Sequence, residues 1–161
     1  MEKLRQDLAV LVLSAETGSG KSTQVVKYVS ENVRGTILCT QPRRVAAMTL
    51  ANRVAEEMQA EPPSKDHVNV VACHGSKSAH KVGRETKIKF MTDASLLSVI
   101  KKDPLLKKVG AVVVDEVHER SVHTDLVISL LRRSLQLLAD KNLGNRYHFK
   151  LDLTYALMNS S

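Results

Sequence analysis

Apolar residues in this chain fall into two alternating patterns, short continuous runs and longer stretches with helical spacing. The runs predict strands at 8–13, 36–40, 67–72, 87–91, 109–114 and 147–153. The helical spacing predicts helices at 21–32, 43–59, 94–101 and 122–139, and the polar stretch 73–84 predicts a loop or hairpin. Continuously apolar strands that alternate with helices are typical of a parallel sheet buried on both faces. The pattern therefore predicts an α/β domain of three layers, with a mostly parallel central sheet between helices.

The charge of the chain favours an acidic partner. The net charge is +7 and the pI is about 9.5, and most of the excess positive charge lies between Lys77 and Lys108. This balance favours nucleic acid, although charge alone also fits a soluble basic domain with no such partner.

Length and cysteine content bear on domain count and location. The 161 residues contain no interdomain linker, so we expect one domain that spans 1–161. Two cysteines, Cys39 and Cys73, and the lack of a secretory pattern indicate an intracellular protein of the nucleus or the cytoplasm. No apolar stretch approaches the roughly 18 residues of a membrane span, so we expect no membrane partner.

A glycine-rich segment, AETGSGKS at 15–22, lies between the first predicted strand and the first predicted helix. Apart from the alanine at its first position, it matches the phosphate loop that binds ATP and Mg²⁺. Gly18 and Gly20 let backbone N–H groups face the phosphates, Lys21 supplies positive charge, and the Ser22 hydroxyl suits Mg²⁺. The alternative is a glycine-rich turn of similar composition. The predicted nucleotide-binding residues of this segment are Glu16, Thr17, Gly18, Ser19, Gly20, Lys21, Ser22 and Thr23.

An acidic segment, DEVHER at 115–120, directly follows the apolar run at 109–114. Because ligands bind beyond the carboxyl ends of parallel strands, we expect Asp115 and Glu116 to lie beside the phosphate loop. Asp115 is predicted to hold Mg²⁺ together with Ser22, and Glu116 to polarise the attacking water. An acidic surface turn at a helix start is the alternative, and the pairing with a phosphate loop argues against it.

Four segments in order, AETGSGKSTQ, TQPRRVAAMTLANRVAEEM, TKIKFMTDASLL and VVVDEVHERSVHTDLVISLLRR, resemble motifs of the DEAH-box helicases of superfamily two. The resemblance covers 8–60 and 84–135. It implies a RecA-like P-loop NTPase domain, the first lobe of an ATP-dependent RNA helicase. In such an enzyme ATP hydrolysis drives RNA unwinding only when a second lobe is present.

The resemblance also implies roles for particular residues. His118 is implied to couple the nucleotide to a second lobe, and Arg53 to stack on the adenine. The implied catalytic residues are Lys21, Asp115, Glu116 and His118. The implied contacts of the RNA backbone are Gln41, Pro42, Arg43 and Arg44, with Thr40 before them, and Thr92 and Asp93.

Plainer interpretations stand beside these roles. Arg43 and Arg44 fit an anion site at a helix N-terminus, or a solvated helix start. Arg53 fits a salt bridge on a helix surface, and Asp93 fits the N-cap of the next helix. A metal site among the histidines and cysteines of 67–80 is not favoured, because their spacing matches no zinc pattern.

Three features depart from the helicase pattern, and one of them is the stretch VVACHGSKSAHKVGRE at 70–85, which lacks the family's usual Gly-Tyr and Arg-Phe. The chain ends at Ser161 without room for a second RecA-like lobe, so we expect that lobe and C-terminal helicase domains as partners in a longer protein. The stretch KLDLTYAL at 150–157 stands where the family has Ser-Ala-Thr. Two alternatives therefore stay open, a truncated or decayed lobe that binds nucleotide or RNA without catalysis, and another P-loop NTPase.

Overall fold

The computed structural model describes residues 10–16, 20–59, 69–74, 77–78, 86–140 and 150–157. In this part of the chain, seven strands form one sheet in the order β1-β7-β6-β2-β5-β3-β4. All neighbours pair in parallel except β3 and β4, which form an antiparallel pair. The mostly parallel sheet is thus confirmed. The strands are β1 (Val10–Glu16), β2 (Thr36–Gln41), β3 (Asn69–His74), β4 (Lys77–Ser78), β5 (Thr86–Thr92), β6 (Val109–Val114) and β7 (Lys150–Leu157).

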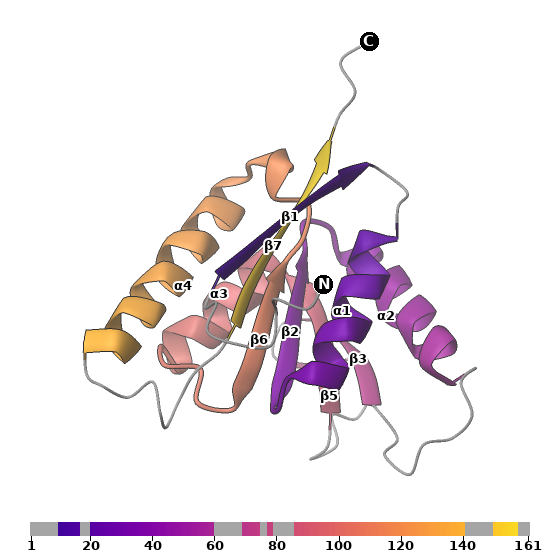
Figure 1. Cartoon of the computed structure of the whole chain (residues 1–161), viewed down its shortest axis with the longest axis horizontal. Coiled ribbons are helices and arrows are strands. Elements are labelled where there is room, and N and C mark those ends of the chain that lie inside the picture. The colour runs from indigo at the N-terminus through magenta and orange to yellow at the C-terminus, as the bar shows by residue number, and fades with distance from the viewer. Residues whose placement is uncertain are drawn as a thin grey trace.

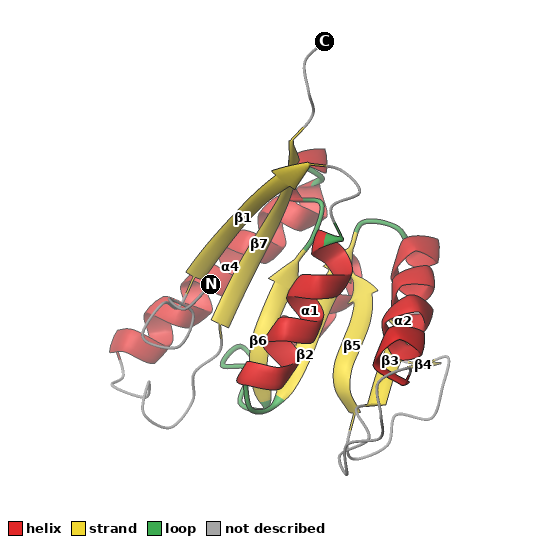
Figure 2. Cartoon of the chain, turned by 45° about the vertical axis from the view of Figure 1, so that its right-hand side comes forward, coloured by secondary structure: helices red, strands yellow, loops and turns green. Residues whose placement is uncertain are grey.

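Helices cover both faces of this sheet, as Figures 1 and 2 show. They are α1 (Lys21–Asn32), α2 (Arg44–Gln59), α3 (Asp93–Lys102) and α4 (Val122–Asp140), with a short 3₁₀ turn, η2 (Val117–Glu119), before α4. None of the described helices is long and apolar enough to cross a membrane.

Alternate residues of the central strands point to opposite faces and build two separate cores. In β2, Ile37 and Cys39 are buried in one core with Val26 of α1, whereas Leu38 is buried in the other with Leu131 of α4. Side chains of successive strand residues point to opposite sides, so a continuously apolar strand fills both cores at once. The three-layer arrangement predicted from the sequence is therefore confirmed.

Glycine is required where the α1–β2 connection crosses the start of β6. A Cβ on Gly110 would lie 1.8 Å from the carbonyl oxygen of Arg34. Gly35 has a φ of 92°, which residues other than glycine rarely adopt. The N–H of Thr36 donates to the carbonyl of Lys108 at 3.1 Å. The register shifts by one residue just after this contact, between Thr36 and Ile37, and is then regular up to the pairing of Thr40 with Val114.

The last strand lies inside the sheet, next to the edge strand β1. β7 pairs with β1 on one side and β6 on the other, and β1 pairs with no other described strand. The sequence predicts a strand at 147–153, and the structure has it at Lys150–Leu157. The other predicted elements lie within three residues of the observed bounds, and the predicted hairpin after β3 is confirmed by its pairing with β4.

Candidate functional site

The motif segments gather at one edge of the sheet. Strands β1, β2, β3, β5, β6 and β7 all run in the same direction, so their carboxyl ends lie at the same edge. The phosphate loop follows β1, TQPRR spans the end of β2, TD spans the end of β5, and DEVH follows β6. In the register, Gln41 pairs with Thr92, and Thr40 pairs with Val114. Residues far apart in the sequence thus meet at one edge, as predicted.

The phosphate loop leads directly into α1. Thr17, Gly18 and Ser19 lie outside the described residues, as does the side chain of Glu16. Gly20 has a φ of 76°, a left-handed conformation that favours glycine. The buried Thr23 hydroxyl donates to the carbonyl of Gly20 at 3.2 Å.

The first turn of α1 is therefore tied to the end of the loop. Lys21 and Ser22 follow Gly20 as its first two residues and are half-buried. The free N–H groups of a helix N-terminus favour an anion such as a phosphate. This end of α1 can therefore receive the phosphates of a nucleotide.

Asp115 is a buried carboxylate held by two donors. Its side chain is 2% exposed. One oxygen accepts from the Gln41 amide at 2.5 Å and the other from the backbone N–H of Glu116 at 2.9 Å. A buried charge is costly without such partners, so these bonds help hold the carboxylate at the end of β6.

Glu116 is turned outward by its own backbone. It has a φ of 55°, a left-handed conformation that costs a non-glycine residue about 1 kcal/mol. The chain then enters η2, in which Val117 is buried. The buried valine anchors the turn while the carboxyl of Glu116 stays half-exposed, 3.3 Å from Nε2 of His118.

The electrostatics connect Glu116 with the start of α1. Burial raises the pKa of the Glu116 carboxyl, and the negative charge of Asp115 raises this pKa further. His118 lowers it, Glu119 raises it, and Lys21 lowers it. Because Coulomb interactions fall with distance, the effect of Lys21 indicates that the phosphate-loop lysine and the acidic motif lie near each other.

The oxygen donors at this edge fit Mg²⁺. Hard oxygens are the ligands that Mg²⁺ prefers, and it is bound through one or two protein groups, water and substrate phosphates. Ser22 offers a hydroxyl and Asp115 a carboxylate. Among the described residues no three His, Cys, Asp or Glu side chains gather into a metal site, and Mg²⁺ with a nucleotide needs no such cluster.

The TQPRR segment divides into a buried and an exposed half. Thr40 and Gln41 are buried, Pro42 is half-buried, and Arg43 and Arg44 are exposed at the start of α2. Within the part of the chain that the structure describes, Arg43 makes one ion pair, a long and exposed contact of 3.8 Å with Glu119 of η2, and such pairs contribute little. The two arginines therefore present their charge to solvent, whereas the Gln41 amide faces Asp115. Reasoning from sequence missed that bond, although a polar residue at the end of a buried strand was a signal for it.

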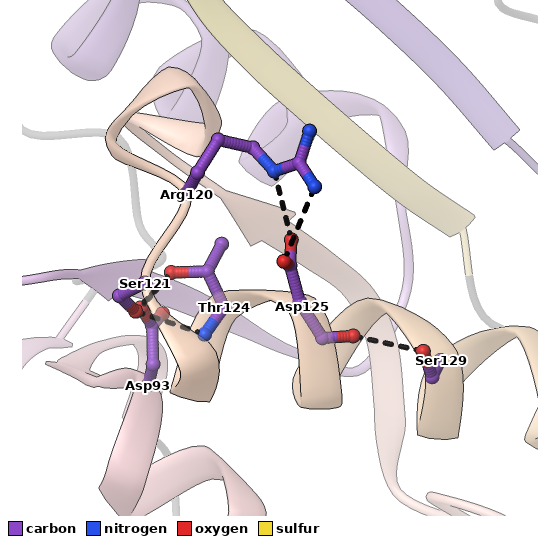
Figure 3. Close-up of polar contacts among 6 residues, drawn as sticks. All are labelled: Asp93, Arg120, Ser121, Thr124, Asp125 and Ser129. Atoms are coloured by element: carbon purple, nitrogen blue, oxygen red, sulfur yellow. Dashed lines mark hydrogen bonds and ion pairs between the residues drawn. The ribbon is translucent and has the colours of Figure 1, made fainter.

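The TD segment also points into the protein. Thr92, not Asp93, caps α3: its hydroxyl oxygen accepts from the N–H of Ser95 at 3.3 Å. The N-cap interpretation of Asp93 was therefore wrong, because two consecutive residues could cap and the helix begins one residue earlier than predicted, at Asp93. Asp93 is 3% exposed, and its carboxylate accepts from the Thr124 hydroxyl at 2.7 Å. Figure 3 shows Asp93 beside Ser121 and Thr124 of the neighbouring segment, and the Ser121 oxygen accepts from the N–H of Thr124 at 3.0 Å.

Arg53 lies on the outer face of α2. Its Nε is 3.0 Å from a carboxylate oxygen of Glu57, one turn later in the same helix. This is the surface salt bridge named as the plainer interpretation, and adenine stacking stays a prediction. The histidines and cysteine of 73–84 have no described side chains, and neither do residues 150–157.

Comparisons with known proteins agree with this arrangement. A family model described as "DEAD/DEAH box helicase" matches residues 2–143. The chain is 40% identical over 156 residues to "Probable ATP-dependent RNA helicase DHX40" of Rattus norvegicus, which covers 95% of this chain and 19% of that protein. It is 42% identical over 138 residues to "Probable ATP-dependent RNA helicase DHX37" of Homo sapiens, with 83% and 11% covered.

A solved structure shares the fold as well. The DEAH/RHA helicase HrpB of Escherichia coli superposes with a TM-score of 0.76 at 33% identity, and the match covers 94% of this chain and 18% of that chain. The predicted RecA-like fold is thereby confirmed. The chain spans less than a fifth of the length of each of these three proteins. Its fold, its motifs and the family match together show that the chain belongs to the DEAD/DEAH box helicase family.

Proposed function

We propose that residues 1–161 form the ATP-binding first motor lobe of a DEAH-box RNA helicase. One observation carries this proposal: the parallel strands bring Lys21, at the start of α1, and the carboxyls after β6 to one edge of the sheet. A site for a nucleoside triphosphate with Mg²⁺ needs this combination of a positive charge, a helix N-terminus and carboxylate oxygens.

The nucleotide is proposed to bind with its phosphates at the start of α1. Lys21 supplies positive charge to the β and γ phosphates, and the helix N-terminus adds backbone donors. Ser22 and Asp115 are the residues that would hold Mg²⁺. When bound, Mg²⁺ neutralises phosphate charge and orients the γ-phosphate.

Glu116 is the candidate for handling the attacking water. Its carboxyl is half-exposed, and burial and neighbouring carboxyls raise its pKa. A carboxylate with a raised pKa holds a proton more readily, which suits a group that polarises water. Nε2 of His118 lies 3.3 Å from this carboxyl. A contact between His118 and a second lobe would therefore change the orientation of Glu116.

RNA is proposed to contact the exposed half of TQPRR. Arg43 and Arg44 lie at the N-terminus of α2 with their side chains in solvent. Guanidinium groups bind phosphates with two parallel hydrogen bonds, and the helix end favours the same charge. This arrangement suits the sugar-phosphate backbone and carries no sequence information.

Unwinding is proposed for a longer protein. The named relatives are several times longer than this chain, and a second RecA-like lobe with C-terminal domains would supply the remaining groups of the ATP site. For this chain alone we expect nucleotide binding and weak RNA binding, with negligible unwinding.

Nucleotide affinity tests the proposal. Lys21→Ala should weaken binding of a fluorescent ADP with Mg²⁺ by about tenfold or more, equal to about 1.4 kcal/mol. The matched control Lys101→Ala, on the exposed end of α3, should bind like the unchanged chain. Equal affinities for both variants would remove Lys21 from the site. In the full-length parent, ATPase activity that does not respond to RNA would favour a different P-loop NTPase.

A further inference from the structure

The side chain of Gln41 connects two separate helicase motifs, TQPRR and DEVH. Gln41 is the last residue of β2, and Asp115 directly follows β6, the strand beside it. The register pairs Thr40 with Val114, so the next residues of both strands come together. The Gln41 amide nitrogen donates to a carboxylate oxygen of Asp115 at 2.5 Å.

This bond lies inside the protein and not on the RNA-facing surface. Gln41 is 3% exposed and Asp115 is 2% exposed. Because Gln41 is buried, an RNA phosphate could reach its amide only if the side chain were displaced from this position. The neighbouring Arg43 and Arg44 are exposed and need no such displacement. The geometry thus separates Gln41 from the arginines that follow it in the same motif.

The consequence for Asp115 is a fixed orientation. One carboxylate oxygen accepts from Gln41, and the other accepts from the N–H of Glu116 at 2.9 Å. Donors on both oxygens hold the plane of the carboxylate, which a single bond would let rotate. Hydrogen-bonding partners of metal ligands act in this way, and their loss typically costs 10–100-fold in metal affinity.

We propose that Gln41 is a positioning residue for the magnesium site and not an RNA contact. Its amide holds the Asp115 carboxylate in the orientation that receives the hydrated Mg²⁺ of a bound nucleotide. The inference rests on the proposed function of this edge as a Mg-nucleotide site. It also places the first exposed arginine, Arg43, two residues after the side chain that holds the metal ligand.

The test compares nucleotide affinity with and without Mg²⁺. Gln41→Met keeps the length of the side chain and removes the donor. A fluorescent ADP is titrated into each protein in EDTA and again in excess Mg²⁺. In excess Mg²⁺ we expect Gln41→Met to bind the fluorescent ADP about 10–100-fold more weakly than the unchanged chain does. In EDTA the two proteins should bind it equally well. The Mg²⁺ concentration for half-maximal binding at fixed nucleotide should rise by the same factor.

Thr124→Val is the matched control. It also removes a buried donor to a carboxylate, since Thr124 donates to Asp93 at 2.7 Å, but has no bond to Asp115. We expect it to keep the full gain from Mg²⁺. If Gln41→Met fails to fold by circular dichroism, Gln41→Asn replaces it, because its shorter amide should leave Asp115 without the donor.

Each outcome has a distinct meaning. A full gain from Mg²⁺ in the Gln41 variant overturns the inference. Equal losses of affinity in EDTA and in Mg²⁺ also overturn it, because they indicate a general structural role. If the unchanged chain itself binds no nucleotide, or if Mg²⁺ does not increase its nucleotide affinity, the proposed function is wrong and the inference, which rests on it, is wrong too.

Discussion

Replacing Thr124 with valine keeps the shape of the side chain and removes one hydroxyl. That hydroxyl donates to the buried Asp93 carboxylate at 2.7 Å, across the contact between α3 and α4 shown in Figure 3. The other oxygen of Asp93 is buried without a hydrogen-bond partner among the described residues. The variant would therefore leave a buried carboxylate with neither side-chain oxygen bonded.

The expected cost follows from this loss. A hydrogen bond to a charged group contributes about 1.5–3 kcal/mol, and an unpaired buried charge places the cost at the upper end. The positive N-termini of α3 and α4 still lie beside Asp93 and offset part of it. We expect the free energy of unfolding to fall by about 2–3 kcal/mol, or roughly 4–12 °C in Tm for a chain of this size.

Urea and thermal denaturation followed by circular dichroism measure this change. Thr49→Val, the same substitution on the exposed face of α2, should change the unfolding free energy by no more than about 0.5 kcal/mol. In an Asp93→Ala background, Thr124→Val should cost less than about 1 kcal/mol, because its acceptor is gone. An equal cost with and without Asp93 would refute the bond as the source of the stability.

Two further predictions concern the site itself. In the metal-free chain, the raised pKa of Glu116 means that the folded state holds its proton more tightly than the unfolded state. This contribution to stability is present below the ordinary value of 4.5 and is lost as pH rises through the raised pKa. Glu116→Gln should remove that part of the pH dependence of the urea midpoint, and parallel curves for both proteins would contradict it. Separately, Arg43→Ala and Arg44→Ala should each reduce the slope of log affinity against log salt for single-stranded RNA by about 0.7, measured by fluorescence anisotropy. An unchanged slope would remove that arginine from the RNA contacts.

Most of the fold could be predicted from the sequence because local signals and the global pattern agreed. The start of α1 follows a phosphate loop, and β6 is a continuous apolar run between polar ends, and both elements begin and end as predicted. The last strand ends four residues later than predicted, because strand-forming residues continue past 153. Its place between β1 and β6 depends on long-range pairing, which no local pattern carries.

The site was predictable in its location and less so in its side-chain contacts. Parallel strands bring their carboxyl ends together whatever their sequence, so the meeting of the motifs followed from the topology. The direction of Gln41 depends on which neighbour lies beside β2, and that is a property of the whole sheet. Thr92 and Asp93 are both able to cap a helix, so a difference of one residue decided which of them did.

The strand order has a consequence for how this domain is made on the ribosome. β1 joins the sheet only through β7 in the described part of the chain, and the register pairs Val10 with Leu151 and Glu16 with Leu157. Loop closure over so many residues is entropically costly and slow. During synthesis β1 emerges long before β7, so Val10 and its neighbours have to wait for residues 151–157 before this pairing can form. The strand that leads into the phosphate loop can therefore join the sheet only after β7 has been synthesised.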